Sequence, residues 1–438
     1  MRNYKLHKLL LLLAILPTFL LGQNNRILTL DEAINLGLNN SKQLKISGAK
    51  LDITKAKRLQ YWNAQIPTVT YTGNYSHLSD NISPFVVGFP TGQITLNPQI
   101  LNQFTNRLSA SQIVFGGFRA IRFYESSEFL EKAAALDIDK DKVEVKNNIV
   151  SACYNLHKLQ SSLDILEKNL VVLRGRATDV KNFVQGGIAL ENDKLKSELA
   201  ISQVEMSQKE VANAIEVANF NLDLMLNLPT STKIELDKNA LFLDKTVGDL
   251  DFYLKNINNR PDLMATDMRN QATAKSVDIA KGGLYPTVSV GANVFFNNPN
   301  QRVFPQEANF KGTWDVGVTV NYNLTNLYTT KFQIQEANAA VAQSNLVKEQ
   351  LTDAAKMEVN ANYFAYQSAL EKIKLSDKSI TQAIENQRVM KNRYDGQIAT
   401  LTELLDADFL LLQTKLNLEN AKTDAELSYY KLLKSVGK

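Results

Sequence analysis

Proline is absent from two long stretches of this chain, residues 99–228 and 306–438, although ten prolines occur elsewhere. A proline inside a helix removes a backbone hydrogen bond and costs about 3 kcal/mol, so stretches without it can form very long helices. In the first stretch, apolar side chains recur in alternating steps of three and four residues, at Leu163, Leu166, Leu170, Leu173, Ala177, Val180 and Val184. A second such row is Leu405, Phe409, Leu412 and Leu416. Both rows predict helices that pack as coiled coils.

The predicted helices are unusually long. If residues 118–182 form one helix, its length is roughly 95 to 100 Å at 1.5 Å per residue, far more than the average helix of a globular domain. One helix cannot bury its own apolar row. Partner helices must therefore come from the same chain or from copies of it.

Four short segments have a different period, in which apolar and small polar residues alternate. They are residues 67–77, 105–115, 286–296 and 312–324, and the clearest of them reads GTWDVGVTVNYNL. Each is about as long as a tilted strand that crosses a bilayer. An amphipathic sheet on a soluble core has the same alternation. Aromatic residues near the strand ends favour the membrane, because such rings collect at its interface.

The first 22 residues predict a secretory signal peptide, since a basic start and an apolar run are followed by the small residue Gly22. No cysteine follows that run to carry a lipid anchor. No later apolar run reaches about 18 residues, so no membrane-spanning helix is predicted. An exported chain of this kind is either soluble or crosses a membrane as a barrel.

A barrel cannot be closed by the strands of one chain. Small closed barrels begin at about eight strands, and an open sheet edge in hydrocarbon leaves backbone groups unpaired at several kcal/mol each. Four strands per chain therefore predict a barrel that is shared between copies.

The chain also repeats itself, which predicts two structural repeats at residues 23–230 and 231–438. The triplet Pro-Thr-Val occurs at 67–69 and again at 286–288, and Gly186, Ile188 and Ala189 match Gly396, Ile398 and Ala399. Each repeat is expected to contain a helix, a strand, a loop, a second strand and a long helix. A tight turn near residue 186 or 396 then leads into a returning helix.

With these motifs in view, the sequence resembles the TolC-type outer-membrane efflux proteins. The resemblance rests on NRPDL at 259–263, LYPTVSV at 284–290, RYDGQIATLTELLDA at 393–407 and IVFGGFR at 113–119. It implies a mainly α fold with β strands, in which three chains form one twelve-stranded barrel above a periplasmic tunnel of coiled helices. It also implies that the homotrimer docks on a periplasmic adaptor and an inner-membrane pump and conducts cargo out of a Gram-negative cell.

The turns between the long helices contain the candidate functional residues. Gly186, Gly187 and Gly396 are expected to provide the positive φ angle of a tight helix connection. After the second turn, Glu403 and Asp406 are three residues apart and share a helix face. In a trimer each would form a ring of three carboxylates facing the pore, which favours cations.

From the residues alone, Glu403 and Asp406 are more simply explained as solvated surface acids. The resemblance implies instead that they line the closed periplasmic end and that Tyr394 helps to hold that end shut. The first repeat departs from this pattern, because Lys196 stands opposite Asp406. Asp193, opposite Glu403, is a weaker candidate for the same constriction.

No enzyme, metal site or cofactor is predicted. After the predicted signal peptide the only histidines are His77 and His157, which are far apart in sequence and lack the spacing of a zinc motif. The only cysteine, Cys153, is expected to be a small buried hydrophobe. A net charge of +4 without a strong basic run argues against nucleic-acid binding. Two alternatives to efflux stay open, a part in type I protein secretion and a periplasmic coiled-coil scaffold that never inserts.

Overall fold

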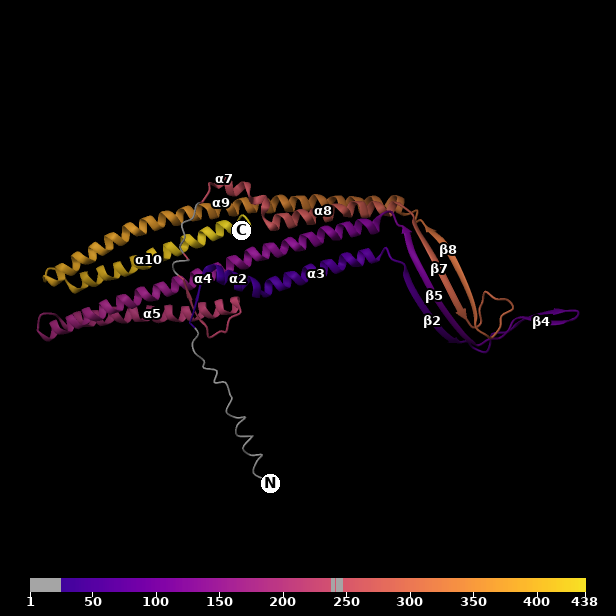
Figure 1. Cartoon of the computed structure of the whole chain (residues 1–438), viewed down its shortest axis with the longest axis horizontal. Coiled ribbons are helices and arrows are strands. Elements are labelled where there is room, and N and C mark those ends of the chain that lie inside the picture. Colours follow the sequence, from indigo (N-terminus) through magenta and orange to yellow (C-terminus); the bar gives the residue numbers. More distant parts are fainter. Residues whose placement is uncertain (1–24, 238–240, 242–246) are drawn as a thin grey trace, which may run out of the picture.

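The computed structural model describes residues 25–237, 241 and 247–438. Its helices lie side by side in an elongated stalk, and a four-stranded sheet leaves one end of the stalk at an angle (Figure 1). The predicted signal peptide, residues 1–22, lies outside the described residues.

Helices make up most of the described chain. They are α2 (Leu30–Asn40), α3 (Lys42–Asn63), α4 (Arg119–Gln185), α5 (Glu191–Leu226), α7 (Leu250–Lys255), α8 (Pro261–Lys281), α9 (Asn326–Asp395) and α10 (Leu401–Lys434), with short 3-10 turns η1 (Ile257–Asn259) and η2 (Gly282–Leu284). The strands are β1 (Asn25–Leu28), β2 (Thr68–His77), β3 (Phe85–Phe89), β4 (Gly92–Asn97), β5 (Asn102–Phe115), β6 (Lys233–Leu236), β7 (Thr287–Asn297) and β8 (Lys311–Asn321).

Two helices run the length of the stalk. Helix α4 has 67 residues and α9 has 70, which corresponds to roughly 100 Å each at 1.5 Å per residue. The single long helix predicted over residues 118–182 is therefore present. Helix α5 returns along α4, and α10 returns along α9 while also packing on α4. Toward the sheet, α3 packs on α4, and α8 packs on both α4 and α9.

The predicted apolar row of α4 is largely buried. Leu166, Leu170 and Leu173 pack with Val204 of α5 and Leu412 of α10. The predicted row of α10 is wrong at one position, because the Phe409 side chain is 63 % exposed. Helix α10 faces both α4 and α9, and its buried row near the turn runs instead through Leu401, Leu404, Ala407 and Asp408.

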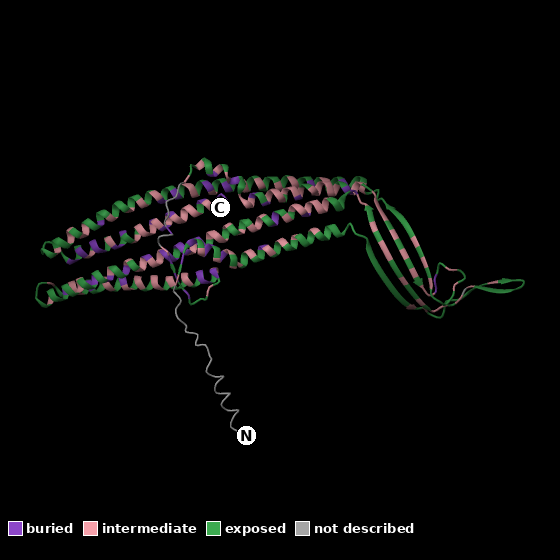
Figure 2. Cartoon of the chain, viewed as in Figure 1, coloured by how far each residue is buried: buried purple, intermediate pink, exposed green. Residues whose placement is uncertain are grey.

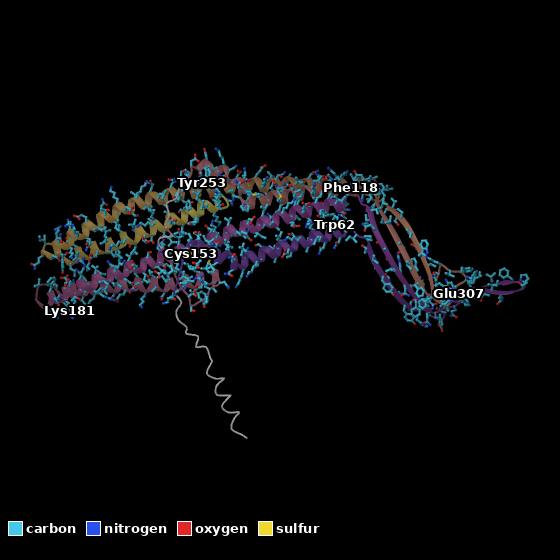
Figure 3. All side chains as sticks on the ribbon, viewed as in Figure 1. Trp62, Phe118, Cys153, Lys181, Tyr253 and Glu307 are labelled. Atoms are coloured by element: carbon cyan, nitrogen blue, oxygen red, sulfur yellow. The ribbon has the colours of Figure 1, made fainter. Side chains whose placement is uncertain are left out.

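The largest core cluster lies midway along the stalk, where β1 pairs in parallel with β6 beside α2, α4 and α5. Tyr154 and Leu222 are fully buried there. Cys153, whose place is labelled in Figure 3, is also fully buried, which confirms the prediction for the cysteine. Burial raises the pKa of the Cys153 thiol to about 12. Elsewhere in the stalk, buried residues follow the helix contacts, and most outward surfaces are exposed (Figure 2).

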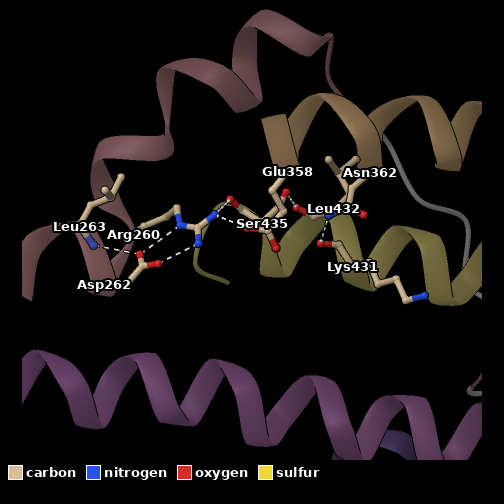
Figure 4. A network of polar contacts seen from close by, with 8 residues as sticks. All are labelled: Arg260, Asp262, Leu263, Glu358, Asn362, Lys431, Leu432 and Ser435. Carbon is tan, nitrogen blue, oxygen red and sulfur yellow. Dashed lines mark hydrogen bonds and ion pairs between the residues drawn. The ribbon is translucent and has the colours of Figure 1, made fainter. Parts of the chain in front are cut away.

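The NRPDL motif ties three helices together at mid-stalk (Figure 4). The Arg260 guanidinium binds both carboxylate oxygens of Asp262 at 3.0 and 2.8 Å, at the start of α8. Its Nη1 also donates to Glu358 Oε2 of α9 at 2.7 Å and to the carbonyl oxygen of Ser435 at 2.9 Å. Arg260 therefore joins α8 and α9 to the end of α10.

The sheet has the order β2-β5-β7-β8, and all neighbours are antiparallel. Strand β5 begins three residues before the predicted segment, because its pairing with β2 continues to His77 opposite Asn102. Strand β8 ends three residues before the predicted end, since the Asn323 side chain accepts the backbone N–H of Thr325 just before α9 begins. The outer strands β2 and β8 each have one edge without a partner in the described chain.

Cross-strand partners show that the sheet has an apolar and a polar face. The apolar face contains Val69, Tyr71, Tyr75, Phe104, Leu108, Ala110, Val288, Val290, Ala292, Val294, Trp314, Val316, Val318 and Val320. The polar face contains Thr68, Thr70, Thr72, Thr105, Ser109, Ser111, Ser289, Asn293, Thr313, Asp315 and Thr319. No other element of the described chain covers the apolar face at Trp314, which is 74 % exposed. Among the described helices, none is long and apolar enough to span a bilayer.

Two glycines allow the sheet to meet the stalk. Gly117 has a φ of 65° between the end of β5 and the start of α4. A Cβ atom at Gly117 would overlap the carbonyl oxygen of Gly282, which lies at the matching junction between α8 and β7. Glycine is required here both for the backbone angle and for the close approach.

The loop between β2 and β5 contains the hairpin of β3 and β4, which sequence analysis did not predict. It projects beyond the end of the sheet that is farther from the stalk (Figure 1).

The two faces of the sheet can be distinguished by cysteine labelling in lipid. We expect a water-soluble maleimide to modify Thr319→Cys on the polar face but not its neighbour Val318→Cys, because the alternation of apolar and polar residues predicts that lipid covers the apolar face. Cys153 gives little background, since it is buried and its thiol pKa is high. Both variants should react fully after denaturation. Equal labelling of both in intact membranes would contradict the assignment.

Candidate functional site at the ends of the helix hairpins

The turns at the free ends of the two hairpins have the same backbone structure. Four backbone hydrogen bonds close the first turn. The N–H of Gly186 donates to the carbonyl oxygen of Asn182, that of Gly187 to Val184, and those of Ile188 and Ala189 both to Phe183. The second turn has the same four bonds. The N–H of Gly396 donates to the carbonyl oxygen of Asn392, that of Gln397 to Tyr394, and those of Ile398 and Ala399 both to Arg393. Corresponding distances are equal to within 0.1 Å. The turns therefore present the two hairpin ends in the same local geometry.

The glycines of these turns do not all have the predicted role. Gly187 has a φ of 72°, but Gly186 and Gly396 have φ angles of −80° and −85°. The prediction of a positive φ was therefore wrong for Gly186 and Gly396. The left-handed residue of the second turn is Gln397, with a φ of 59°, at a cost of roughly 1 to 2 kcal/mol. A Cβ atom at Gly396 would lie 3.3 Å from the Asn392 carbonyl oxygen, which is a tighter contact than most Cβ atoms make.

Glu403 lies in the first turn of helix α10. Its backbone N–H donates to Thr400 Oγ1 at 3.3 Å, and its Oε2 accepts the N–H of Thr400 at 2.7 Å. This reciprocal pair is a capping box. The backbone hydrogen bond from Thr400, together with that from its hydroxyl, lowers the pKa of Glu403, so the exposed carboxylate stays charged. In the first hairpin Asp193 has a similar role, with Oδ2 accepting the N–H of Leu190 at 3.4 Å.

Asp406 is exposed and lines a groove between α5 and α10. Lys196 and Thr402 line the same groove, and Lys196 Nζ donates to Thr402 Oγ1 at 2.9 Å. A lysine of the first hairpin thus contacts the second hairpin close to Asp406. Glu403 and Asp406 are both accessible, but the Glu403 carboxylate turns back onto its own helix cap. Their arrangement as rings stays a prediction.

Tyr394 is half-buried in the last turn of α9. Burial raises the pKa of its phenol, and the nearby charges of Asp193 and Asp179 raise it further. The phenol is therefore neutral and can donate a hydrogen bond. The structure brings Tyr394 of the second hairpin near the acids of the first, as a contact between hairpin ends requires.

A buried ion pair, which sequence analysis missed, joins the hairpins near their ends. Arg176 Nε of α4 lies 2.7 Å from Asp408 Oδ2 of α10, and Nη2 donates to Oδ1 at 2.9 Å. The two side chains are only 12 % and 5 % exposed. Gln387 of α9 also donates to Asp408 Oδ1, at 3.2 Å. Three helices therefore share one polar contact inside an apolar interface.

A signal for this pair was present in the sequence. Arg176 follows Leu173 by three residues and precedes Val180 by four, so it lies beside Ala177 on the apolar side of α4. Asp408 follows Leu404 by four residues and precedes Leu412 by four. Opposite charges inside two apolar rows suggest that the rows face each other. Burial raises the pKa of Asp408 above its ordinary value, and the positive charge of Arg176 opposes that shift.

Removing Arg176 tests the buried pair. Arg176→Gln should cost about 3 to 5 kcal/mol at neutral pH, because it leaves Asp408 buried without a counter-charge. Since burial raises the folded-state pKa of Asp408 above the unfolded value, the folded variant binds an extra proton between those two values. Its stability should therefore recover as the pH falls, which thermal unfolding between pH 4 and 8 would measure.

Arg388→Gln is the matched control, because Arg388 pairs with Glu385 on the exposed surface of α9. It should change the midpoint little at any pH. Equal effects of the two substitutions would show that the Arg176 pair does not stabilise the hairpin ends.

Comparison with known proteins identifies the class to which this architecture belongs. Residues 254–438 match the family model described as outer membrane efflux protein. The chain is 22 % identical over 351 residues to toxin and drug export protein A of Aggregatibacter actinomycetemcomitans, covering 75 % of this chain and 74 % of that protein.

Solved structures share the fold over nearly the whole chain. The structure of CusC, a protein that forms a transmembrane channel, matches with a TM-score of 0.79 and 16 % identity, covering 93 % of this chain and 91 % of that one. The outer membrane protein VceC from Vibrio cholerae matches with a TM-score of 0.76 and 17 % identity, covering 93 % and 96 %.

Residues 254–438 thus match the outer membrane efflux protein family, and the chain as a whole shares the fold of CusC and VceC. The resemblance to TolC-type proteins and the predicted outer-membrane location are thereby confirmed. The family and fold are those of channels rather than enzymes. Among the described residues, no group of three His, Cys, Asp or Glu side chains could hold a metal ion.

Proposed function

We propose that three copies of this chain form an outer-membrane efflux channel whose barrel contains four strands from each copy. The observation that carries the proposal is an amphipathic sheet with two unpaired edges, β2 and β8. Because four antiparallel strands alternate in direction, β8 of one copy can pair antiparallel with β2 of the next. Closure satisfies every edge hydrogen bond, as lipid requires.

The stalk also has exposed helix surfaces on the same two sides as the unpaired strand edges. Helices α3 and α9 are the outer helices of the layer that continues from the sheet. Both expose apolar side chains, including Ile46, Ile53 and Leu59 on α3 and Phe332, Leu346 and Phe364 on α9. Exposed apolar rows on the two outer helices can pack against each other between copies. The same three-fold arrangement that closes the barrel thus covers the exposed apolar side chains of α3 and α9.

The channel supplies a path but no source of energy. Long helix hairpins end far from the sheet, so their ends can reach partners across the periplasm (Figure 1). We assign the docking of a periplasmic adaptor and an inner-membrane pump to that end. The relative from Aggregatibacter actinomycetemcomitans is named for toxin and drug export, and the family model for efflux. These names favour efflux over a role confined to type I protein secretion.

A periplasmic scaffold that never inserts is less well supported. It would leave the apolar face of the sheet in water, including Trp314 and Val316, which no described residue covers. An exposed apolar surface of that extent is unfavourable in a soluble monomer. Insertion in lipid removes the conflict.

At the hairpin ends, we assign the constriction to Glu403, Asp406, Asp193 and Tyr394, with Gly186, Gly187 and Gly396 shaping the turns. A ring of carboxylates around an axis favours cations. Tyr394, neutral and near Asp193, is placed to link neighbouring ends. The buried pair of Arg176 and Asp408 would hold the two hairpins of one chain together behind this ring.

Ion selectivity in planar bilayers tests the acidic ring. Glu403→Gln with Asp406→Asn should reduce cation preference, and replacing both with lysine should move it toward anions. The glutamine variant preserves the side-chain acceptor of the helix cap, so it separates the charge from the start of α10. Unchanged selectivity in both double variants would refute the ring, although the channel itself could still stand.

A further inference from the structure

A charged cluster lies on the polar face of the sheet, toward the end farther from the stalk. Its residues are Arg107 of β5, Asn293 and Phe295 of β7, Asp315 of β8, and Arg302 of the segment between β7 and β8. Arg107 is paired with Phe295, two residues before β7 ends. The cluster therefore lies far from the acidic residues at the hairpin ends.

The Arg107 side chain has a fixed orientation. Its Nη2 and Nε groups donate to Asn293 Oδ1 at 2.8 and 3.1 Å. Asn293 Nδ2 in turn donates to Asp315 Oδ1 at 2.6 Å. Asp315 Oδ2 lies 2.6 Å from Nη2 of Arg302. A chain of polar contacts thus runs across three strands and onto the following segment.

Phe295 breaks the alternation of β7, because it places an aromatic ring on the polar face. The guanidinium carbon of Arg302 lies 4.2 Å from the ring centroid, and that of Arg107 lies 5.6 Å from it. Both distances are within the range of cation–π attraction. Phe295 therefore attracts the guanidinium groups of Arg302 and Arg107 on the polar face of the sheet.

The acids in this region do not neutralise all of its cations. The charged residues of the four strands and of residues 298–310 are Arg107, Arg302, Lys311, Glu307 and Asp315, which gives three positive and two negative charges. Arg302 pairs with Asp315, and Lys311 pairs with Glu307 at 3.2 Å. Arg107 is held by a neutral amide and forms no ion pair within the described part of the chain.

In the trimer of the proposed function, on which this inference rests, the polar face lines the lumen. We propose that three copies of Arg107 form a ring near the outer mouth that binds anionic groups of passing cargo. Asn293 and Phe295 orient each guanidinium, and its remaining N–H groups face the lumen. A planar guanidinium suits carboxylate, sulfonate or phosphate groups, which it can bind through two hydrogen bonds. The mouth thus favours anions and the hairpin ends favour cations.

Two substitutions that remove charges of opposite sign test this ring in planar bilayers. The reversal potential is measured in a gradient of dilute KCl, because screening by salt is then weak. Arg107→Gln should lower the ratio of chloride to potassium permeability by roughly two-fold. Asp315→Asn should raise it, because it leaves Arg302 without its counter-charge. Arg107→Lys keeps the positive charge and should stay near the wild-type ratio.

The double variant Arg107→Gln with Asp315→Asn is the matched control. It has the wild-type net charge in this cluster, so its permeability ratio should return to the wild-type value. Unchanged ratios in both single variants, or shifts of the same sign, would overturn the ring while leaving the channel intact. A wild-type protein that inserts but never conducts would contradict the proposed function itself.

Discussion

Every backbone N–H and C=O group that enters a bilayer must find a partner in the protein, because lipid offers none. This chain has four strands with one apolar face, and its two outer strands have unpaired edges. The sheet is too narrow to close on itself. In the proposed trimer, neighbouring copies pair with both edges, and the rest of the architecture is arranged around that pairing.

In the proposed trimer, the stalk extends the same symmetry away from the membrane. The sheet meets the stalk through the contact between Gly117 and Gly282, where no Cβ atom fits, so the direction of the strands is coupled to that of the helices. Further along, α4 serves as the central helix on which α3, α5, α8 and α10 all pack. The Arg260 network at mid-stalk and the Arg176 pair near the ends then join helices that are distant in sequence. Apolar packing supplies most of the cohesion, and these polar contacts fix which helices meet.

Much of the fold could be predicted from the sequence because it depends on local periodicity. The absence of proline predicted α4 and α9, and alternation predicted the sheet strands to within a few residues. The capping role of Glu403 was also readable, as Thr400 precedes it by three residues. The Arg176 pair was missed because its partners are 232 residues apart, and their contact depends on which helix rows face each other. The exposure of Phe409 has the same cause. The left-handed Gln397 could not be predicted from residue type, because a neighbouring glycine was available.

The two electrostatic regions show why sequence and structure contribute differently to a functional account. Glu403 and Asp406 are three residues apart, so spacing alone shows that they share a helix face, but their assignment to a constriction came from the resemblance to TolC-type proteins. The Arg107 cluster combines three strands and a following segment, so only the register of the sheet reveals it. The functions proposed for both regions depend on three copies of the chain surrounding a common axis.

The mass of the detergent-solubilised particle tests that dependence most directly, and native mass spectrometry after release from the micelle would measure it. The account predicts three copies of the chain per particle. A single folded chain, stable in buffer without detergent and with its apolar sheet face covered, would contradict it.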